Sequence, residues 1–313
     1  MKQLFLACAI LLTLSTVFVS CGSDDTDPLP VVEIYAEVDA DDPYSISYSA
    51  VAQYVTSYNW DFGDGNVSVE GAPTHTYAQS GKYTVTLTAK GGGGETIATK
   101  EIEILASIQE LLSGGPAMPN GKKWVMSAIA NPGTDGVSNK VIDPITGADI
   151  EFPATDNLLA IIGLGVEYDN LFTFKYDGAY SLDYVNENCL AGYLYSVMEG
   201  LTITTPTGYG LVQAVHAEAT GATWTLEEGV DLVIDAANQP VVGGAIDEVT
   251  VTFQDVDVLT FNNGGFLGLL DYTPKAIIRE ISSDRLSVTL FLHGVQEHPS
   301  KPSNLITLTF DAI

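Results

Sequence analysis

The stretch Tyr58-Asn59-Trp60-Asp61-Phe62-Gly63-Asp64-Gly65 decides the fold of the N-terminal part of this chain. Trp60 and Phe62 lie on one face of a strand, because alternate side chains of a strand share a face. The Gly-Asp-Gly segment that follows tolerates the positive φ angles of a tight turn. The sequence therefore predicts a half-buried strand that ends in a turn at Gly63.

A second diagnostic stretch follows this turn. It contains His75-Thr76-Tyr77 and then the segment 81–89, in which Tyr, Val, Leu and Ala alternate with polar residues as in a half-buried strand. Together with the first stretch, these residues resemble the PKD domain, an immunoglobulin-like β-sandwich with the motifs W-D-F-G-D-G, H-x-Y and G-x-Y-x-V-x-L. The resemblance covers residues 30–105 and implies a spacer or a protein or glycan contact module, not a catalyst.

Two features of this domain could suggest a metal. His75 has no second His or Cys at ligand spacing, so we expect a partly buried histidine that bonds to the neighbouring turn. Asp39, Asp41 and Asp42 could offer oxygen ligands to calcium, but they lack the spacing and the glycine of an EF-hand. We therefore predict a solvated acidic loop, no cofactor and no specific calcium site.

The N-terminus carries an export signal. Residues 1–20 contain one basic residue and an apolar segment that is too short for a comfortable membrane span. Val17-Phe18-Val19-Ser20-Cys21 resembles the lipobox of bacterial lipoproteins, which implies that Cys21 is lipidated and becomes the first mature residue. Residues 21–29 form an acidic tether, and Gly22-Ser23-Asp24-Asp25-Thr26-Asp27 within it resembles a signal for the outer face of the outer membrane; a simple flexible tether is the alternative. We expect a lipid-anchored outer-membrane protein exposed at the cell surface.

Composition limits the partners. Twelve Lys and Arg residues against 40 Asp and Glu residues would repel nucleic-acid phosphates, so nucleic acid is excluded as a partner. The same charge opposes contact with an anionic membrane, so the membrane is reached through the lipid anchor only. After processing, Cys189 has no cysteine left to pair with, and we expect it to be a small buried hydrophobic residue.

Residues 106–122 form a linker. Ser107-Ile108-Gln109-Glu110 has the spacing of a capping box, and Gly114-Gly115-Pro116 ends the short helix that it predicts. The segments Leu111–Gly115 and Gly121–Val125 are similar to the start of the C-terminal β domains of PKD-bearing surface lipoproteins. The linker therefore leads into a second domain, residues 123–313.

Alternating apolar residues predict about ten antiparallel strands in this second domain, with a short helix over residues 156–164. A three-residue loop with left-handed Gly178 would put the aromatic residues of segments 172–176 and 180–184 on one face. Glu227-Glu228-Gly229 predicts a second odd-length loop, which would place Trp224 and Leu226 beside Leu232 and Ile234. The chain is therefore all-β, and its C-terminal domain is either a jelly-roll sandwich or a lipocalin-like barrel.

No catalytic residue is predicted. The carboxylate pattern E-x-D-x-x-E, the zinc motif H-E-x-x-H and the serine motif G-x-S-x-G are missing from the sequence. Asp255 and Asp257 flank a valine in an alternating strand and are expected to face solvent. A glycoside hydrolase would need a site assembled from distant loops, so an enzyme is the least favoured function.

Glycan binding has a better basis, because aromatic faces stack on sugar C–H groups and polar side chains bond to hydroxyls. Several aromatic and polar residues occur where strand alternation does not require them; these candidate ligand-binding residues are Tyr193, Tyr195, Tyr209, Phe266, Tyr272, Asn262 and Asp271. Trp124 and Trp224 continue apolar strand faces, so we assign them to the core.

The lipobox, acidic tether, PKD-like stretch and β domain together resemble the accessory glycan-binding lipoproteins of Sus-like uptake systems. This resemblance implies capture of an oligosaccharide or polysaccharide through the second domain, beside outer-membrane uptake proteins, with the first domain as a spacer or contact module. An adhesion or structural lipoprotein that contacts protein is the alternative.

Overall fold

The computed structural model describes residues 27–40, 42–138, 141, 152–184, 187–207, 210–238 and 246–313. The predicted signal and Cys21 lie outside this range, as does Tyr209. The chain divides into two compact units; the first ends at Glu103, and the second runs from Ile104 to Ile313 and includes Ala78–Gly81. Within the described ranges, none of the helices has the length and hydropathy required to cross a membrane.

The N-terminal unit contains two antiparallel sheets. Their strands are β1 Val31–Val38, β2 Ser45–Gln53 and β5 Thr74–Thr76 in the first, and β4 Val67–Ser68, β3 Ser57–Asp61, β6 Gly81–Gly91 and β7 Gly94–Ile104 in the second. The buried side chains between them include Tyr48, Trp60, Val85 and Leu87. As predicted, the strand bearing Trp60 ends before a turn with positive φ at Gly63.

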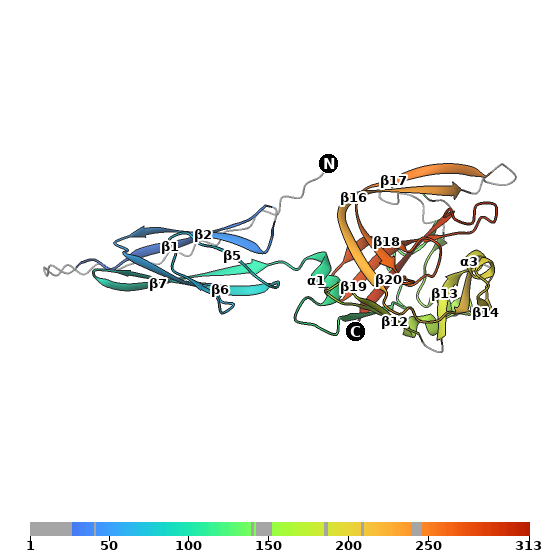
Figure 1. Cartoon of the computed structure of the whole chain (residues 1–313), viewed down its shortest axis with the longest axis horizontal. Coiled ribbons are helices and arrows are strands. Elements are labelled where there is room, and N and C mark those ends of the chain that lie inside the picture. Colours follow the sequence, from blue (N-terminus) through green and yellow to red (C-terminus); the bar gives the residue numbers. More distant parts are fainter. Residues whose placement is uncertain are drawn as a thin grey trace. The chain divides into compact units, whose positions relative to one another are not determined.

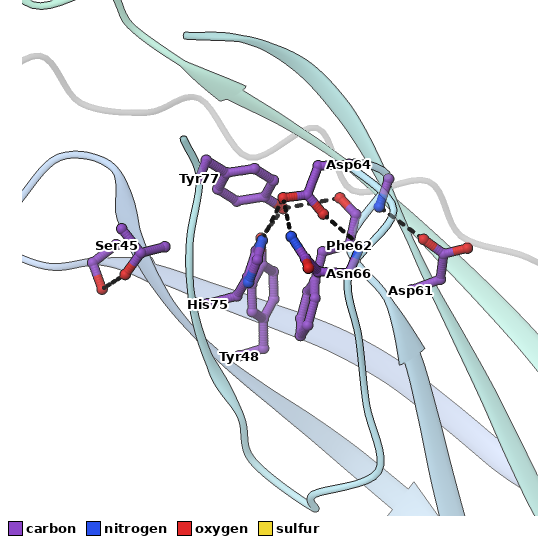
Figure 2. A network of polar contacts seen from close by, with 10 residues as sticks. Ser45, Tyr48, Asp61, Phe62, Asp64, Asn66, His75 and Tyr77 are labelled. Carbon is purple, nitrogen blue, oxygen red and sulfur yellow. Dashed lines mark hydrogen bonds and ion pairs between the residues drawn. The ribbon is translucent and has the colours of Figure 1, made fainter. Parts of the chain in front are cut away.

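The turn after β3 is held by the polar network shown in Figure 2. His75 Nε2 lies 2.7 Å from Asp64 Oδ2, and the imidazole stacks on the Phe62 ring at 4.2 Å between centroids. The Tyr77 hydroxyl donates to the Phe62 carbonyl at 3.1 Å and lies 2.7 Å from the Tyr48 hydroxyl. His75 therefore binds the neighbouring turn, as the sequence predicts.

The helix α1, Ile108–Ser113, begins the second unit in the way that the capping box predicts. The Ser107 hydroxyl accepts from the Glu110 amide at 3.2 Å, and left-handed Gly114 ends the helix at φ 79°. The Trp124 indole then donates to the Leu112 carbonyl at 2.9 Å. This bond ties the helix to the first strand of the C-terminal sheet.

Ten of the described strands form one antiparallel sheet, in the order β12-β11-β8-β20-β19-β18-β17-β16, with β9 and β10 attached beside β20. Their bounds are β8 Lys122–Met126, β9 Gly136–Ser138, β10 Phe152–Pro153, β11 Leu171–Phe174, β12 Tyr180–Asp183, β16 Thr223–Asn238, β17 Asp247–Asn262, β18 Lys275–Ile281, β19 Arg285–Leu292 and β20 Asn304–Ala312. The helix α2, Leu158–Ile161, and the 3-10 turn η2, Val166–Asp169, precede β11.

The sheet is not closed into a barrel, so the lipocalin-like alternative is wrong. Among the described residues, its edge strands β12 and β16 meet only at an isolated bridge between Ala179 and Thr223. Beyond that bridge, β16 and β17 run on as a long two-stranded ribbon (Figure 1). The all-β class and the antiparallel second domain are confirmed.

The hairpin between β11 and β12 has the predicted loop. Phe174 pairs with Tyr180, the Lys175 amide donates to the Ala179 carbonyl at 3.0 Å, and Gly178 has φ 86°. The three-residue loop places Phe172, Phe174, Tyr180, Leu182 and Tyr184 together in the core.

The loop predicted at Glu227-Glu228-Gly229 is wrong, because the chain does not turn there. The segment is a β-bulge inside the continuous strand β16, and a second bulge at Asp255, with φ 53°, restores the register in β17. Each extra residue moves later side chains to the opposite face. Trp224 consequently packs in one hydrophobic cluster, whereas Leu232 and Ile234 pack in another.

The long insertion after Cys189 forms a separate small sheet and a helix. The sheet has the order β13-β15-β14, with bounds Asn188–Gly192, Leu211–Val215 and Thr202–Pro206, and the helix α3 spans Tyr193–Met198. Buried side chains of β13 and β15 join the larger hydrophobic cluster that also contains Trp124, Phe172 and Phe310. Figure 1 shows α3 beside β13 and β14.

Candidate functional site

The insertion brings α3 to the segment 270–272. Ala191, near the end of β13, forms a parallel bridge with Leu270. The Gly192 amide donates to the Leu270 carbonyl at 3.0 Å, and the Leu270 amide donates to the Leu190 carbonyl at 2.9 Å. Since α3 begins at the next residue, these bonds fix its first turn beside Asp271 and Tyr272.

Aromatic side chains from both segments meet here. The rings of Tyr195 and Tyr272 pack edge to face, with 4.8 Å between centroids and 72° between planes. Tyr193 lies two residues before Tyr195 on α3, and its side chain is 49 % exposed. We define the aromatic surface as Tyr272 with the accessible residues of α3 and its end: Tyr193, Tyr195, Val197, Met198 and Glu199. Tyr195 and Glu199 share the side of α3 that meets Tyr272, and Tyr193 and Val197 lie on another side.

Glu199 supplies a carboxylate to this surface. Glu199 is exposed at the end of α3, and its carboxylate accepts a hydrogen bond from the Tyr272 hydroxyl. Burial, followed by the nearby carboxylates of Glu199 and Asp271, raises the pKa of both Tyr195 and Tyr272. Both phenols are therefore neutral hydrogen-bonding groups at physiological pH, next to a charged acceptor.

A buried polar group lies beneath the aromatic surface. Asp271 Oδ1 lies 3.0 Å from His293 Nδ1, and both side chains are almost completely inaccessible to solvent. Asp271 also accepts from the backbone amides of Tyr272 and His293, at 2.8 and 3.0 Å, and Thr273 Oγ1 lies 3.2 Å from His293 Nε2. The hydrogen bond to Asp271 fixes the backbone of Tyr272 and thereby the position of its ring in the aromatic surface.

Gly192 lets the buried carboxylate approach the chain. A Cβ at residue 192 would collide with Asp271 Oδ2, so only glycine fits at this position. The turn between β13 and α3 and the carboxylate at 271 are therefore mutually dependent.

The structure brings together three of the predicted ligand-binding residues, Tyr195, Tyr272 and Asp271, whereas Tyr193 lies on the same helix but on the side away from Tyr195. Asp271 is 6 % exposed, so it supports the surface from below. Phe266 is only 2 % exposed and packs against Phe172 and Tyr184, so its ring offers no face to a ligand and we remove it from the candidates.

Asn262 ends β17 opposite Thr223 and is exposed. The contacts of the described residues do not link it to the aromatic surface. Tyr209 and the lipidation residue Cys21 lie outside the described residues, so both stay predictions.

Sequence reasoning missed Glu199, His293 and the exposed pair Val197 and Met198, which are 52 % and 53 % exposed. Helical spacing was the available signal for Glu199, because residues four apart on a helix are neighbours and Tyr195 stands four positions earlier. For His293 the sequence carries no comparable signal, since its contact with Asp271 joins remote segments.

Other candidate groups prove to be structural. Burial raises the pKa of the Cys189 thiol to about 12, which agrees with the predicted buried hydrophobic residue. Trp124 and Trp224 are 0 % and 4 % exposed, as expected for core residues. Asp255 is exposed in the predicted way, whereas Asp257 accepts from the Gly229 amide in the bulge. Across the described residues, no group of three His, Cys, Asp or Glu side chains is arranged to hold a metal.

Comparison with known proteins finds short matches to proteases, by name a collagenase and a metalloprotease. Collagenase ColA of Bacillus cereus is 54 % identical over 41 residues, which are 13 % of this chain and 4 % of the collagenase. Pre-pro-metalloprotease PrtV of Vibrio cholerae is 48 % identical over 42 residues, or 13 % of this chain and 5 % of the protease. The match thus spans only a small fraction of the length of these curated relatives.

Two solved structures are similar to a part or to most of this chain. The PKD1 domain of Vibrio anguillarum Epp aligns over 26 % of this chain and 98 % of its own length, with 29 % identity and a TM-score of 0.24. A structure from a study of carbohydrate-binding modules of the β-sandwich superfamily aligns over 91 % of this chain and 92 % of its own, with 12 % identity and a TM-score of 0.24. The PKD domain family model matches residues 26–105, and the N-terminal part of this chain is therefore a PKD domain.

Proposed function

We propose that this protein captures glycan on the aromatic surface of its C-terminal domain. The carrying observation is the edge-to-face pair of Tyr195 and Tyr272, on a helix whose first residue is the exposed Tyr193. Pyranose rings present C–H groups that stack on such aromatic faces, and an exposed Tyr binds them with little loss of conformational freedom.

Polar groups beside the rings can orient a bound sugar through hydrogen bonds. The Glu199 carboxylate already accepts from Tyr272, and a second carboxylate oxygen can accept from a sugar hydroxyl. Stacking faces with a few polar groups are typical of sites that bind sugars without cleaving them. Glycoside hydrolysis needs two suitably separated carboxyl groups, and Asp271 is buried against His293.

In this proposal, the other parts of the chain hold the C-terminal domain at the cell surface. Cys21 carries a lipid anchor in the outer membrane, residues 21–29 form a tether at the cell surface, and the PKD domain acts as a spacer. The captured glycan is then passed to outer-membrane uptake proteins.

A second function, protein adhesion, is favoured by one face of the PKD domain. Strands β1 and β2 expose Val31, Tyr35 and Val51, which are 54 %, 48 % and 62 % accessible. Exposed apolar residues gathered on one sheet face are typical of contact surfaces. One relative that matches a short part of this chain is a collagenase, so collagen is a suitable protein probe.

The deciding experiment is affinity electrophoresis of the protein without its signal, in gels that contain plant and host polysaccharides, with collagen as an additional immobilised probe. Glycan capture predicts saturable retardation by at least one polysaccharide and no release of reducing ends. Retardation should be lost in the double variant Tyr193→Ala/Tyr272→Ala and retained in the matched variant Tyr35→Ala/Val51→Ala. Binding to collagen alone, lost in the second variant, would replace glycan capture by adhesion.

A further inference from the structure

The charge distribution around the aromatic surface restricts the ligand further. Between Tyr176 and Pro274 the sequence contains no Lys and no Arg, but it contains fourteen Asp and Glu residues. This segment provides β13, α3, β15 and both edges of the aromatic surface. Eight of the fourteen lie in β16 and β17; the segments that form the surface, 188–215 and 270–272, contain the acidic residues Glu199 and Asp271 and no Lys or Arg.

The charged residues in and below the surface, Glu199 and Asp271, are both acidic. Glu199 is exposed at the end of α3, and Tyr272 binds it through a neutral hydroxyl instead of a cation. Asp271 lies directly below, paired with His293. Among the described residues, the Lys residues nearest in sequence to the surface are Lys175 and Lys275, which lie at the borders of the acidic segment.

From these observations, and resting on the proposed function, we propose that the aromatic surface binds glycans that lack carboxylate, sulfate and phosphate groups. An anionic sugar would approach like charges without a basic side chain to pair with, at a cost that is largest at low ionic strength. An uncharged sugar avoids this repulsion, stacks on the tyrosines and donates its hydroxyls to the carboxylate. The Glu199 carboxylate thus accepts hydrogen bonds from an uncharged sugar and repels an anionic one.

The test uses matched polysaccharides that share a backbone and differ in charge: dextran with dextran sulfate, hydroxyethyl cellulose with carboxymethyl cellulose, and methyl-esterified with de-esterified homogalacturonan. Retardation of the protein is measured for both members of each pair at about 10 mM and about 500 mM salt, where the screening lengths differ severalfold. We expect at least one uncharged member to bind and its anionic partner to bind at least about tenfold more weakly at low salt. At high salt, the difference in affinity between the two members of a pair should become smaller, because the charges are screened.

Variants that neutralise or reverse the charge of Glu199 test whether this surface causes the preference for uncharged glycans. Glu199→Gln should reduce the discrimination, and Glu199→Lys should reduce it further, whereas Glu101→Gln, at an exposed position of the PKD domain, should leave it unchanged. Equal or tighter binding of the anionic members at low salt, when it is lost in Tyr193→Ala, would overturn the charge inference and leave glycan capture standing. Binding of no member of any pair would overturn both.

Discussion

The ring of Tyr272 meets the ring of Tyr195 edge-on, at 4.8 Å between centroids, although the two residues belong to remote segments. Neither residue alone offers a binding surface. The bridge between Ala191 and Leu270 creates the contact, because it lays the start of α3 against the chain that leads to Tyr272.

Removing one ring from the aromatic surface should weaken glycan binding without loss of fold. Tyr193→Ala or Tyr272→Ala should each remove a stacking contribution of roughly 0.5 to 1.5 kcal/mol, which lowers affinity about two- to tenfold. Titration calorimetry with a polysaccharide that retards the wild type measures this change. Tyr176→Ala, at a 39 % exposed tyrosine in the β11–β12 loop, is the matched control and should bind like the wild type. Unchanged affinity in both surface variants would contradict the assignment of the site.

His293 should stabilise the C-terminal domain. His293→Ala removes the imidazole from the buried Asp271 carboxylate, which keeps its two backbone amide donors, so the loss should cost about 1.5 to 3 kcal/mol. His298→Ala is the control, because His298 pairs with the half-exposed Glu248 and such pairs contribute at most about 1 kcal/mol. Urea unfolding followed by tryptophan fluorescence gives both free energies. Similar values for the two variants would show that the buried pair is not a stabilising contact.

The PKD domain should lose stability in acid through Asp64. Burial alone would raise the pKa of this carboxyl, but hydrogen bonds from Asn66 and His75 outweigh it and hold the pKa below its usual 3.8. The folded protein therefore binds the proton less readily than the unfolded chain. The stabilisation is present above about pH 4 and is lost as the pH falls through the lowered value. Thermal melts from pH 6 to pH 2 should show this loss, and Asp64→Asn should flatten it; a parallel decline in both proteins would exclude Asp64 as the cause.

Residues 30–105 should unfold cooperatively as an isolated fragment, because Trp60, Tyr48, Val85 and Leu87 bury one another within it. Trp60→Ala should cost about 3 to 5 kcal/mol, since the side chain is 0 % exposed. Tyr54→Ala, at a tyrosine 58 % exposed, should cost no more than about 0.5 kcal/mol. Denaturant melts of the fragment check these values, and a fragment that melts without cooperativity would move the domain boundary.

Cys21 should carry the lipid. It follows an apolar segment and a small residue in lipobox order, so Cys21→Ser should abolish incorporation of a labelled fatty acid in cells. Cys189→Ser keeps Cys21 and is the matched control, because its thiol is buried in the C-terminal domain. Equal labelling of Cys21→Ser and the wild type would refute the anchor.

Local chain chemistry explains why parts of the fold were predictable. The loop at Gly178 follows from hairpin parity, since only an odd loop puts the aromatic residues of β11 and β12 on one face. The Ser107 cap and the turn at Gly63 likewise depend on neighbouring residues alone. His75 was assigned to its neighbouring turn for the same reason.

Tertiary partners explain what was not predictable. The residues Glu227-Glu228-Gly229 are typical of a turn. The bulge at Asp255 in β17 compensates for the extra residue in β16, so the two strands stay paired on both sides of it. The helix α3 lacks a side-chain cap at Gly192, so no local signal marks its start. Tyr195 and Tyr272 were identified separately as unexplained aromatic residues, whereas their contact depends on a bridge between remote strands.

The position of β8 in the sheet has a consequence for the order in which the chain folds. This first strand of the C-terminal sheet lies between β11 and the last strand, β20, with Phe310 opposite Met126 and the Ile313 amide bonded to the Lys123 carbonyl. The middle of the sheet therefore cannot assemble until the final residues of β20 have arrived, and closing so long a loop is slow. The PKD domain depends on no such distant segment. During synthesis or transport from the N-terminus, the first domain can be complete before the C-terminal domain has received its last strand.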